Sequence, residues 1–271
     1  MRPIFVLGCP RSGTTLLFRL LQCHEGLGTP SGEGHILWNK YQHPRFRGWT
    51  SDRLTAEDVQ PEEPVFLYTA IDRIAGGKRF LDKTPRNCLR VPYLVSLFPD
   101  ASFVLLKRDG PPTVSSLIEG WTVRHGVSYR LPVDLDLDEY QGNLWCYMLP
   151  PGWKTLRDTS IRDIAAHQYV ASYETALNDL SSIPSDRVAS LTYEELVSRP
   201  VEVLSDLLAA LDLPPSAAVS AMANDLSSHQ VQTNSPPRPD KWRDRIEEIR
   251  EVMPLISPTM ERMGYETSLE R

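Results

Sequence analysis

The sequence predicts an α/β fold in which a central parallel β-sheet is flanked by helices, and three observations support it. Apolar runs at 4–7, 101–106 and 187–191 are each followed by a polar turn and a helix-like pattern, which is typical of parallel sheets. The first run leads into a glycine-rich turn resembling a nucleotide-binding P-loop. The length of 271 residues with 41% hydrophobic content suits one large domain spanning 1–271.

The first predicted strand, Ile4–Leu7, has four apolar residues, two of them β-branched. A tight turn from Gly8 to Gly13 follows, and Thr14 begins a helix. A strand, a glycine loop and a helix N-terminus together form an anion site, because backbone N–H groups point into the loop. A nucleotide-triphosphatase loop would have Lys at position 14, whereas here the loop's cation is Arg11. The residues expected to bind a phosphate are Arg11, Ser12, Gly13, Thr14 and Thr15.

The next loop carries the candidate base. Glu33 stands between two glycines, so the backbone is free to expose its carboxylate, and His35 follows as a second candidate. Residues 36–64 are aromatic, basic and rich in proline, and we expect an irregular segment that faces the substrate. Residues 65–74 have helical periodicity.

Two further strands end in basic residues. Residues 79–83 are predicted as a short strand with Lys83 at its carboxyl end, where open α/β sheets bind their ligands. Residues 101–107 form a second apolar strand, and Arg108 follows it. A helix starting at the prolines 111 and 112 carries Ser116, so Arg108 and Ser116 could hold one phosphate.

The acidic residues between 134 and 139 predict a solvated loop. An EF-hand calcium loop needs Gly at its sixth position and Glu at its twelfth, and leucines interrupt this run. We expect 138–153 to form another irregular wall of the acceptor site.

The C-terminal part alternates helices with one strand. Helices are predicted over 161–180, 194–197, 200–211 and 246–263, and a third strong strand over 187–193. The polar, proline-containing stretch 227–243 is predicted as a loop that folds over a nucleotide, with Lys241 beside Trp242.

Composition narrows the function. A net charge of −6 argues against a general nucleic-acid binder. The four cysteines are scattered without metal-ligand spacing, so we expect reduced thiols and no metal. Neither a signal peptide nor an apolar run of ~18 residues is visible, which predicts a soluble cytoplasmic protein without a membrane span. The sequence leaves a homodimer open.

Together these motifs resemble the sulfotransferases that use 3′-phosphoadenosine 5′-phosphosulfate (PAPS). The stretch 10–16 (PRSGTTL) is similar to their 5′-phosphosulfate loop, and Arg108 with Ser116 to their 3′-phosphate clamp. The order of motifs is closest to protein-tyrosine sulfotransferases, with 31–33 (SGE) like their base motif and 81–85 (LDKTP) like their lysine motif. Gly34 and Ile36 stand where those enzymes have Glu and Arg, which favours the soluble bacterial relatives acting on small molecules.

The resemblance implies a role for each matched residue. Glu33 would be the general base, with a raised pKa, and Lys83 would stabilise the bridging oxygen of the leaving group, while Arg11 would hold the phosphosulfate. The residues assigned to the rest of the nucleotide are Arg108, Ser116, Tyr193, Ser227, Lys241 and Trp242.

The expected reaction is in-line transfer of a sulfuryl group from PAPS to a hydroxyl of a small molecule, such as a natural product, sugar or phenol. The products would be the sulfated acceptor and 3′-phosphoadenosine 5′-phosphate (PAP). Three alternatives stay open: a protein-tyrosine sulfotransferase, a P-loop kinase, and a nucleotide-binding protein without catalysis.

Overall fold

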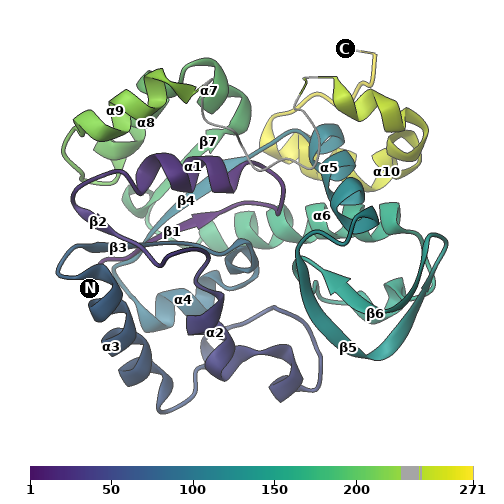
Figure 1. The fold of residues 1–271 in the computed structure, drawn as a ribbon, viewed down its shortest axis with the longest axis horizontal. Helices are drawn as coiled ribbons and strands as arrows, with labels where there is room; N and C mark the ends of the chain where they lie inside the picture. Colours follow the sequence, from purple (N-terminus) through teal and green to yellow (C-terminus); the bar gives the residue numbers. More distant parts are fainter. Residues whose placement is uncertain (227–237, 239, 271) are drawn as a thin grey trace.

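The computed structural model describes residues 1–226, 238 and 240–270. In these residues a five-stranded sheet has the order β2-β3-β1-β4-β7, and every neighbouring pair is parallel (Figure 1). Its strands are β1 (Ile4–Leu7), β2 (Leu27–Gly28), β3 (Arg79–Lys83), β4 (Ser102–Lys107) and β7 (Val188–Thr192). The predicted α/β fold with a central parallel sheet is confirmed.

Strand β1 lies in the middle of this sheet because it is apolar throughout. All four of its side chains are inaccessible to solvent, as expected of a strand covered on both faces. Val6 is in register with Lys83 of β3 on one side and with Val104 of β4 on the other. The carboxyl ends of the three strands therefore meet at one edge of the sheet, which brings together the segments that follow them.

Alternate residues of β1 enter two different cores. Phe5 packs on the face covered by α3 (Glu63–Ala75), α4 (Val91–Leu97), α5 (Gly110–Thr122), α6 (Ile161–Leu180) and α10 (Ile246–Met263). Val6 packs on the opposite face, under α1 (Thr14–Leu21), α7 (Tyr193–Ser198), α8 (Pro200–Ala210) and α9 (Ala217–Asn224). Figure 1 shows α1, α8 and α9 together on one side of the sheet and α4 and α6 on the other. Helices α6 and α10 have the predicted bounds, whereas α9 was not predicted.

The stretch 36–64 is more ordered than expected. It begins with α2 (His35–Gln42), and short 3₁₀ helices follow at Pro44–Arg47 and Ala56–Asp58. Trp38 of α2 is buried, and its Nε1 donates a hydrogen bond of 3.1 Å to the Asp82 carboxylate at the end of β3. This aromatic residue therefore belongs to the core and fixes the helix against the sheet.

The prediction of an acidic loop followed by an irregular wall was wrong for most of 127–146. These residues form an antiparallel hairpin of β5 (Val127–Leu137) and β6 (Tyr140–Cys146). Leu135 and Leu137 are buried, whereas Asp134 and Asp136, which alternate with them, are exposed. The leucines that interrupt the acidic run are the inward-facing residues of a strand with period two. The further 3₁₀ helices are Pro85–Leu89, Trp153–Leu156, Ser185–Arg187 and Lys241–Arg245.

Candidate active site

The loop between β1 and α1 is held in a conformation that requires glycine. Gly13 has φ of 99°, and a Cβ placed there would lie 2.7 Å from Cε2 of Tyr193. Arg11, two residues earlier, also has a positive φ, of 70°. α1 begins at Thr14, and the first N–H groups of a helix have no partner inside the helix. The loop thus presents donors and a positive helix end to the cavity that it borders.

Two arginines from distant parts of the chain meet at this loop. Nη1 of Arg108, which follows β4, donates a hydrogen bond of 2.9 Å to the backbone carbonyl oxygen of Arg11. Nε of Arg11 donates a hydrogen bond of 3.2 Å to Oγ of Ser116 on α5. The guanidinium of Arg108 lies 4.1 Å from the centre of the Tyr193 ring. The structure therefore gathers these four predicted residues.

The charge of these two arginines is not neutralised by nearby acids. Among the described residues, no carboxylate oxygen lies within 4.0 Å of the guanidinium of Arg11 or Arg108. The Nε atom of Arg108 is buried and has no hydrogen-bond partner within the described part of the chain. Guanidinium groups bind phosphate oxygens through paired, charge-assisted hydrogen bonds. This end of the cavity is suited to a polyanion.

The second cluster surrounds Glu33. The ammonium group of Lys83, at the end of β3, contacts one carboxylate oxygen of Glu33 and donates a hydrogen bond of 3.1 Å to Oγ1 of Thr15. Nε2 of His35 lies 2.5 Å from the other carboxylate oxygen. Lys83 thus joins the candidate base to the first turn of α1, where the loop presents its donors.

The expectation that Glu33 has a raised pKa was wrong for the protein without ligands. Partial burial raises the pKa of Glu33, but the hydrogen bond from His35 and the charge of Lys83 outweigh it and lower the pKa to about 2. The carboxylate is therefore ionised at neutral pH.

The remaining predicted nucleotide residues lie in different settings. Lys241 and Trp242 both border the cavity, and the Lys241 ammonium lies 2.7 Å from the Glu119 carboxylate on α5. Ser12 is completely buried and does not border the cavity, because its side chain lies beneath the loop, close to Gly8. Ser227 lies outside the described residues.

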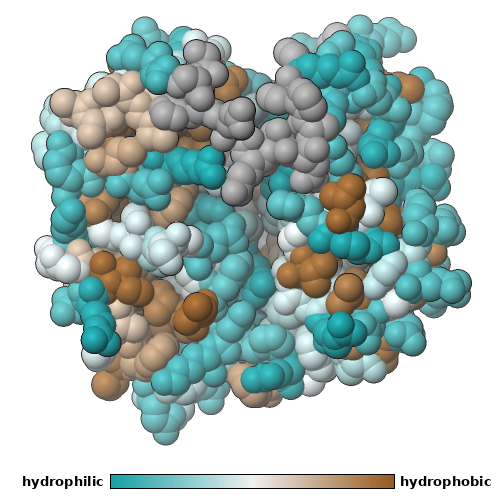
Figure 2. All heavy atoms as spheres, in the orientation of Figure 1, coloured by the Kyte–Doolittle hydropathy of each residue, from teal (hydrophilic) through white to brown (hydrophobic). Residues whose placement is uncertain are grey.

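One cavity of about 480 Å³ connects both clusters. It opens on the face in Figure 2, which is hollowed along its middle between mainly hydrophilic residues. Residues that the sequence did not predict also border it: Arg86, Ser115, Glu119, His125, Ser128, Tyr147 and Met148. The arginine could have been found from its place three residues after Lys83, in the turn that follows β3.

The described residues include neither a cluster of metal ligands nor a helix that could span a membrane. Within 1–226, 238 and 240–270, no three His, Cys, Asp or Glu side chains are grouped so as to hold a metal ion. In the same ranges no helix combines the length and apolar character needed to cross a bilayer.

The model of the Sulfotransferase family matches residues 3–217. The chain belongs to the sulfotransferase family. The match includes both strand-end loops and the hairpin, and it ends before the segment that carries Lys241 and Trp242.

Among relatives, the chain is 28% identical to nodulation protein NoeE of Sinorhizobium fredii over 300 residues, which is 98% of this chain and 66% of NoeE. It is 25% identical to protein-tyrosine sulfotransferase 1 of Danio rerio over 287 residues, 97% of this chain and 72% of that protein. The chain thus spans about two thirds of the length of these two relatives.

Among solved structures, mouse sulfotransferase SULT7A1 complexed with PAP has a TM-score of 0.54 at 15% identity, over 96% of this chain and 84% of that chain. The similarity covers nearly all of this chain, so the chain has the sulfotransferase fold.

Proposed function

We propose that this chain transfers the sulfuryl group of PAPS to a hydroxyl of a small-molecule acceptor and releases PAP. The observation that carries this proposal is that one cavity holds two arginines without acidic partners at one end and an ionised Glu33 bound to Lys83 at the other. A polyanionic donor needs the arginines at the first end of the cavity, and an acceptor hydroxyl needs the base at the second end. Family membership and the PAP bound to SULT7A1 support the choice of donor.

At the donor end, the N–H groups at the start of α1 and the Arg11 side chain would bind the 5′-phosphosulfate. Arg108 and Ser116 would bind the 3′-phosphate. Both contact Arg11, and they come from the end of β4 and from α5, next to the phosphate loop. Lys241 borders the same cavity and would approach the nucleotide after exchanging Glu119 for a phosphate.

In the transfer, a new bond forms between the acceptor oxygen and sulfur while the bond from sulfur to the 5′-phosphate oxygen breaks. The acceptor's proton passes to Glu33, and the electron pair of the broken bond stays on the bridging oxygen of PAP. Lys83 would stabilise that developing charge, since its ammonium group already lies 3.1 Å from Thr15 at the phosphate loop.

The low pKa of Glu33 is compatible with a role as the base, because this pKa changes during the reaction. While Lys83 and His35 hold the carboxylate, it is a weak base. When the ammonium of Lys83 turns to the bridging oxygen, Glu33 loses a compensating charge and its pKa rises. The proton acceptor becomes stronger as the leaving group acquires negative charge, which couples the two halves of the reaction.

A peptide tyrosine is the second candidate acceptor, because the chain resembles the Danio rerio protein-tyrosine sulfotransferase over 97% of its length. The sequence favours a small molecule, since Gly34 and Ile36 replace the Glu and Arg found at those positions in tyrosine enzymes. We further infer that 1–271 act as one domain, because elements from both ends of the chain border the same cavity.

The test is the Glu33→Gln variant, with transfer and nucleotide binding measured separately. Incubation with labelled PAPS and a library of small hydroxyl compounds and tyrosine peptides, followed by mass analysis, identifies the acceptor. Glu33→Gln is expected to lower turnover about 10²–10³-fold while PAP still binds, because a preorganised group of this kind commonly contributes that much.

Glu57→Gln is the matched control, since Glu57 is exposed on a 3₁₀ helix and does not border the cavity. It should behave as the wild type. Unchanged turnover of Glu33→Gln would remove Glu33 as the base, and absence of PAP binding to the wild type would refute the donor.

A further inference from the structure

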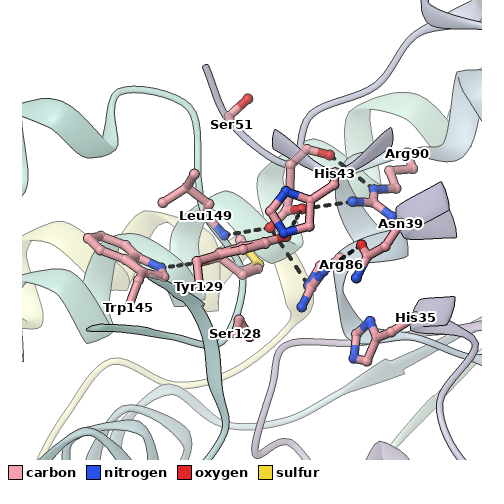
Figure 3. A network of polar contacts seen from close by, with 12 residues as sticks. His35, Asn39, His43, Ser51, Arg86, Arg90, Ser128, Tyr129, Trp145 and Leu149 are labelled. Carbon is pink, nitrogen blue, oxygen red and sulfur yellow. Dashed lines mark hydrogen bonds and ion pairs between the residues drawn. The ribbon is translucent and has the colours of Figure 1, made fainter. Parts of the chain in front are cut away.

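A third arginine borders the cavity on the side of the base. Arg86 lies in the 3₁₀ helix Pro85–Leu89, directly after β3 and Lys83, and only 6% of its side chain is exposed. It borders the cavity together with Glu33, His35 and Ser128. Figure 3 shows its guanidinium with His35 and Ser128 nearby and with Asn39 and Tyr129 as its direct neighbours.

The acid closest to Arg86 is already neutralised by another residue. The Asp52 carboxylate accepts hydrogen bonds from Arg90 at 2.7 Å, from the Tyr129 hydroxyl at 2.5 Å and from the backbone N–H of Leu149 at 2.7 Å. Asp52 and Arg90 are both completely buried and form a neutral pair. Nε of Arg86 lies 3.9 Å from Asp52, beyond hydrogen-bond distance.

Arg86 and Arg90 therefore share the single carboxylate of Asp52, so this buried cluster carries one positive charge in excess. Among the described residues, no carboxylate other than that of Asp52 lies within 4.0 Å of Arg86. Burial and the positive charges of Arg45 and Arg86 lower the pKa of nearby His43, which favours its neutral form. A buried charge is unfavourable unless a partner compensates it, and a ligand in the cavity can be that partner.

The guanidinium is held in one orientation. It lies 4.6 Å from the centre of the Tyr129 ring, and its Nη1 donates a hydrogen bond of 3.1 Å to Oδ1 of Asn39. A guanidinium has five N–H donors in a planar fork. The contacts with Asn39 and Asp52 involve Nη1 and Nε, which leaves the edge at Nη2 for a second, planar partner such as a carboxylate.

Asn39 also connects this arginine to the helix that carries His35. It lies one helical turn, roughly 6 Å, after His35 on α2. His35 in turn contacts Glu33. Because Glu33 and Arg86 border the same cavity, an acceptor whose hydroxyl meets Glu33 can reach Arg86 with a second group.

We propose that Arg86 determines acceptor specificity by binding a carboxylate of the acceptor, so that the substrates of this site are small hydroxy acids. This proposal rests on the sulfotransferase function proposed above and names its acceptor class. Arg11 and Arg108 bind the donor, and Arg86 binds the acidic group of the second substrate.

The experiment compares acceptors that differ only in charge, 4-hydroxyphenylacetate with 4-hydroxyphenylacetamide and glucuronate with glucuronamide. Transfer from labelled PAPS and calorimetric binding to the PAP-loaded protein are both measured. The wild type is expected to favour each acid over its amide by about 10- to 100-fold, the usual worth of a hydrogen bond to a charged group. In Arg86→Gln the ratio of acid to amide is expected to fall to about one.

Asn39→Asp is the matched second variant, because it leaves Arg86 in place and neutralises it with a carboxylate at the position of the present amide. Asn39→Asp should abolish the preference for acids, and it provides the test if Arg86→Gln folds poorly. Arg86→Lys, which keeps a positive charge, should retain part of the preference. Equal binding of acids and amides by the wild type, or a preference that survives in both Arg86→Gln and Asn39→Asp, would overturn the proposal. If no sulfuryl transfer occurs, the proposed function is refuted. The difference in binding between each acid and its amide then still tests the role of Arg86.

Discussion

Replacing Gly13 with alanine tests how the phosphate loop supports the nucleotide arginines. The φ of 99° at Gly13 is costly for any residue with a Cβ, by ~1–2 kcal/mol. The new Cβ would also lie 2.7 Å from Cε2 of Tyr193 and nearer still to Cδ2, so the ring must move. Such overpacking commonly costs ~1–3 kcal/mol, and we expect a total loss of ~2–5 kcal/mol in the free energy of unfolding.

The displaced ring also supports the guanidinium of Arg108, 4.1 Å from its centre. Losing a cation–π contact worth ~0.5–2 kcal/mol should weaken PAP binding about 10-fold. Urea unfolding measures the stability and isothermal calorimetry the PAP affinity. Gly48→Ala is the matched control, because Gly48 has φ of 63° but no atom within 4 Å of the added Cβ, so it isolates the backbone term of ~1–2 kcal/mol.

The expected loss in the free energy of unfolding of Gly13→Ala is the sum of the clash with the Tyr193 ring and the backbone strain. Introducing Tyr193→Ala together with Gly13→Ala should bring the cost of the glycine substitution down to that of Gly48→Ala. Equal destabilisation by Gly13→Ala and Gly48→Ala in the wild-type background, with PAP affinity unchanged, would refute this expectation.

Three further outcomes follow from buried and paired charges. Asp52→Asn should lower the free energy of unfolding by ~3–5 kcal/mol in urea, because it leaves Arg90 buried without a counter-charge; a loss below ~1 kcal/mol would contradict this. The pKa of Glu33 is lowered from 4.5 to about 2 in the folded protein, so its stabilising contribution is present above pH 4.5 and is lost as the pH falls toward 2. Glu33→Gln should therefore be less stable than the wild type at pH 7, by ~1–2 kcal/mol after allowing for its 34% exposure, and this difference should narrow below pH 4; a constant difference would disprove the low pKa. Lys83→Met should raise the pKa of Glu33 and move the acidic limb of the pH–rate profile, along which the base becomes protonated, to higher pH.

The sheet could be predicted because its signal is local. Ile4–Leu7 and 103–106 are continuous apolar runs, and each is followed within a few residues by turn residues and a helix start. Lys83 and Arg108 follow such strands, so their meeting at one edge follows from parallel pairing alone. These features depend on short stretches of sequence and on a general rule of sheet topology.

The hairpin was missed because charge obscured its periodicity. The alternation of Leu135 and Leu137 with Asp134 and Asp136 is a strand pattern, but the acidic residues suggested a solvated loop. The pKa of Glu33 could not be predicted from sequence either. It depends on Lys83, fifty residues away in the chain, being brought into contact with the carboxylate.

Arg86 shows a third reason why sequence alone falls short. Its nearest acid, Asp52, could equally have been its salt-bridge partner. Only the packing reveals that Arg90 occupies that carboxylate at 2.7 Å. The excess of one buried positive charge results from the arrangement of Arg86, Arg90 and Asp52, and no local sequence pattern predicts that arrangement.

The cavity has walls from the beginning, the middle and the end of the chain, with Arg11, Tyr147 and Trp242 all bordering it. A bound nucleotide would tie these distant segments to one another, so its binding energy would also oppose unravelling of the C-terminal helix. The increase in resistance to limited proteolysis caused by PAP would then show whether the entire chain has folded. A fragment lacking the last helix should gain no such protection, however well its phosphate loop is formed.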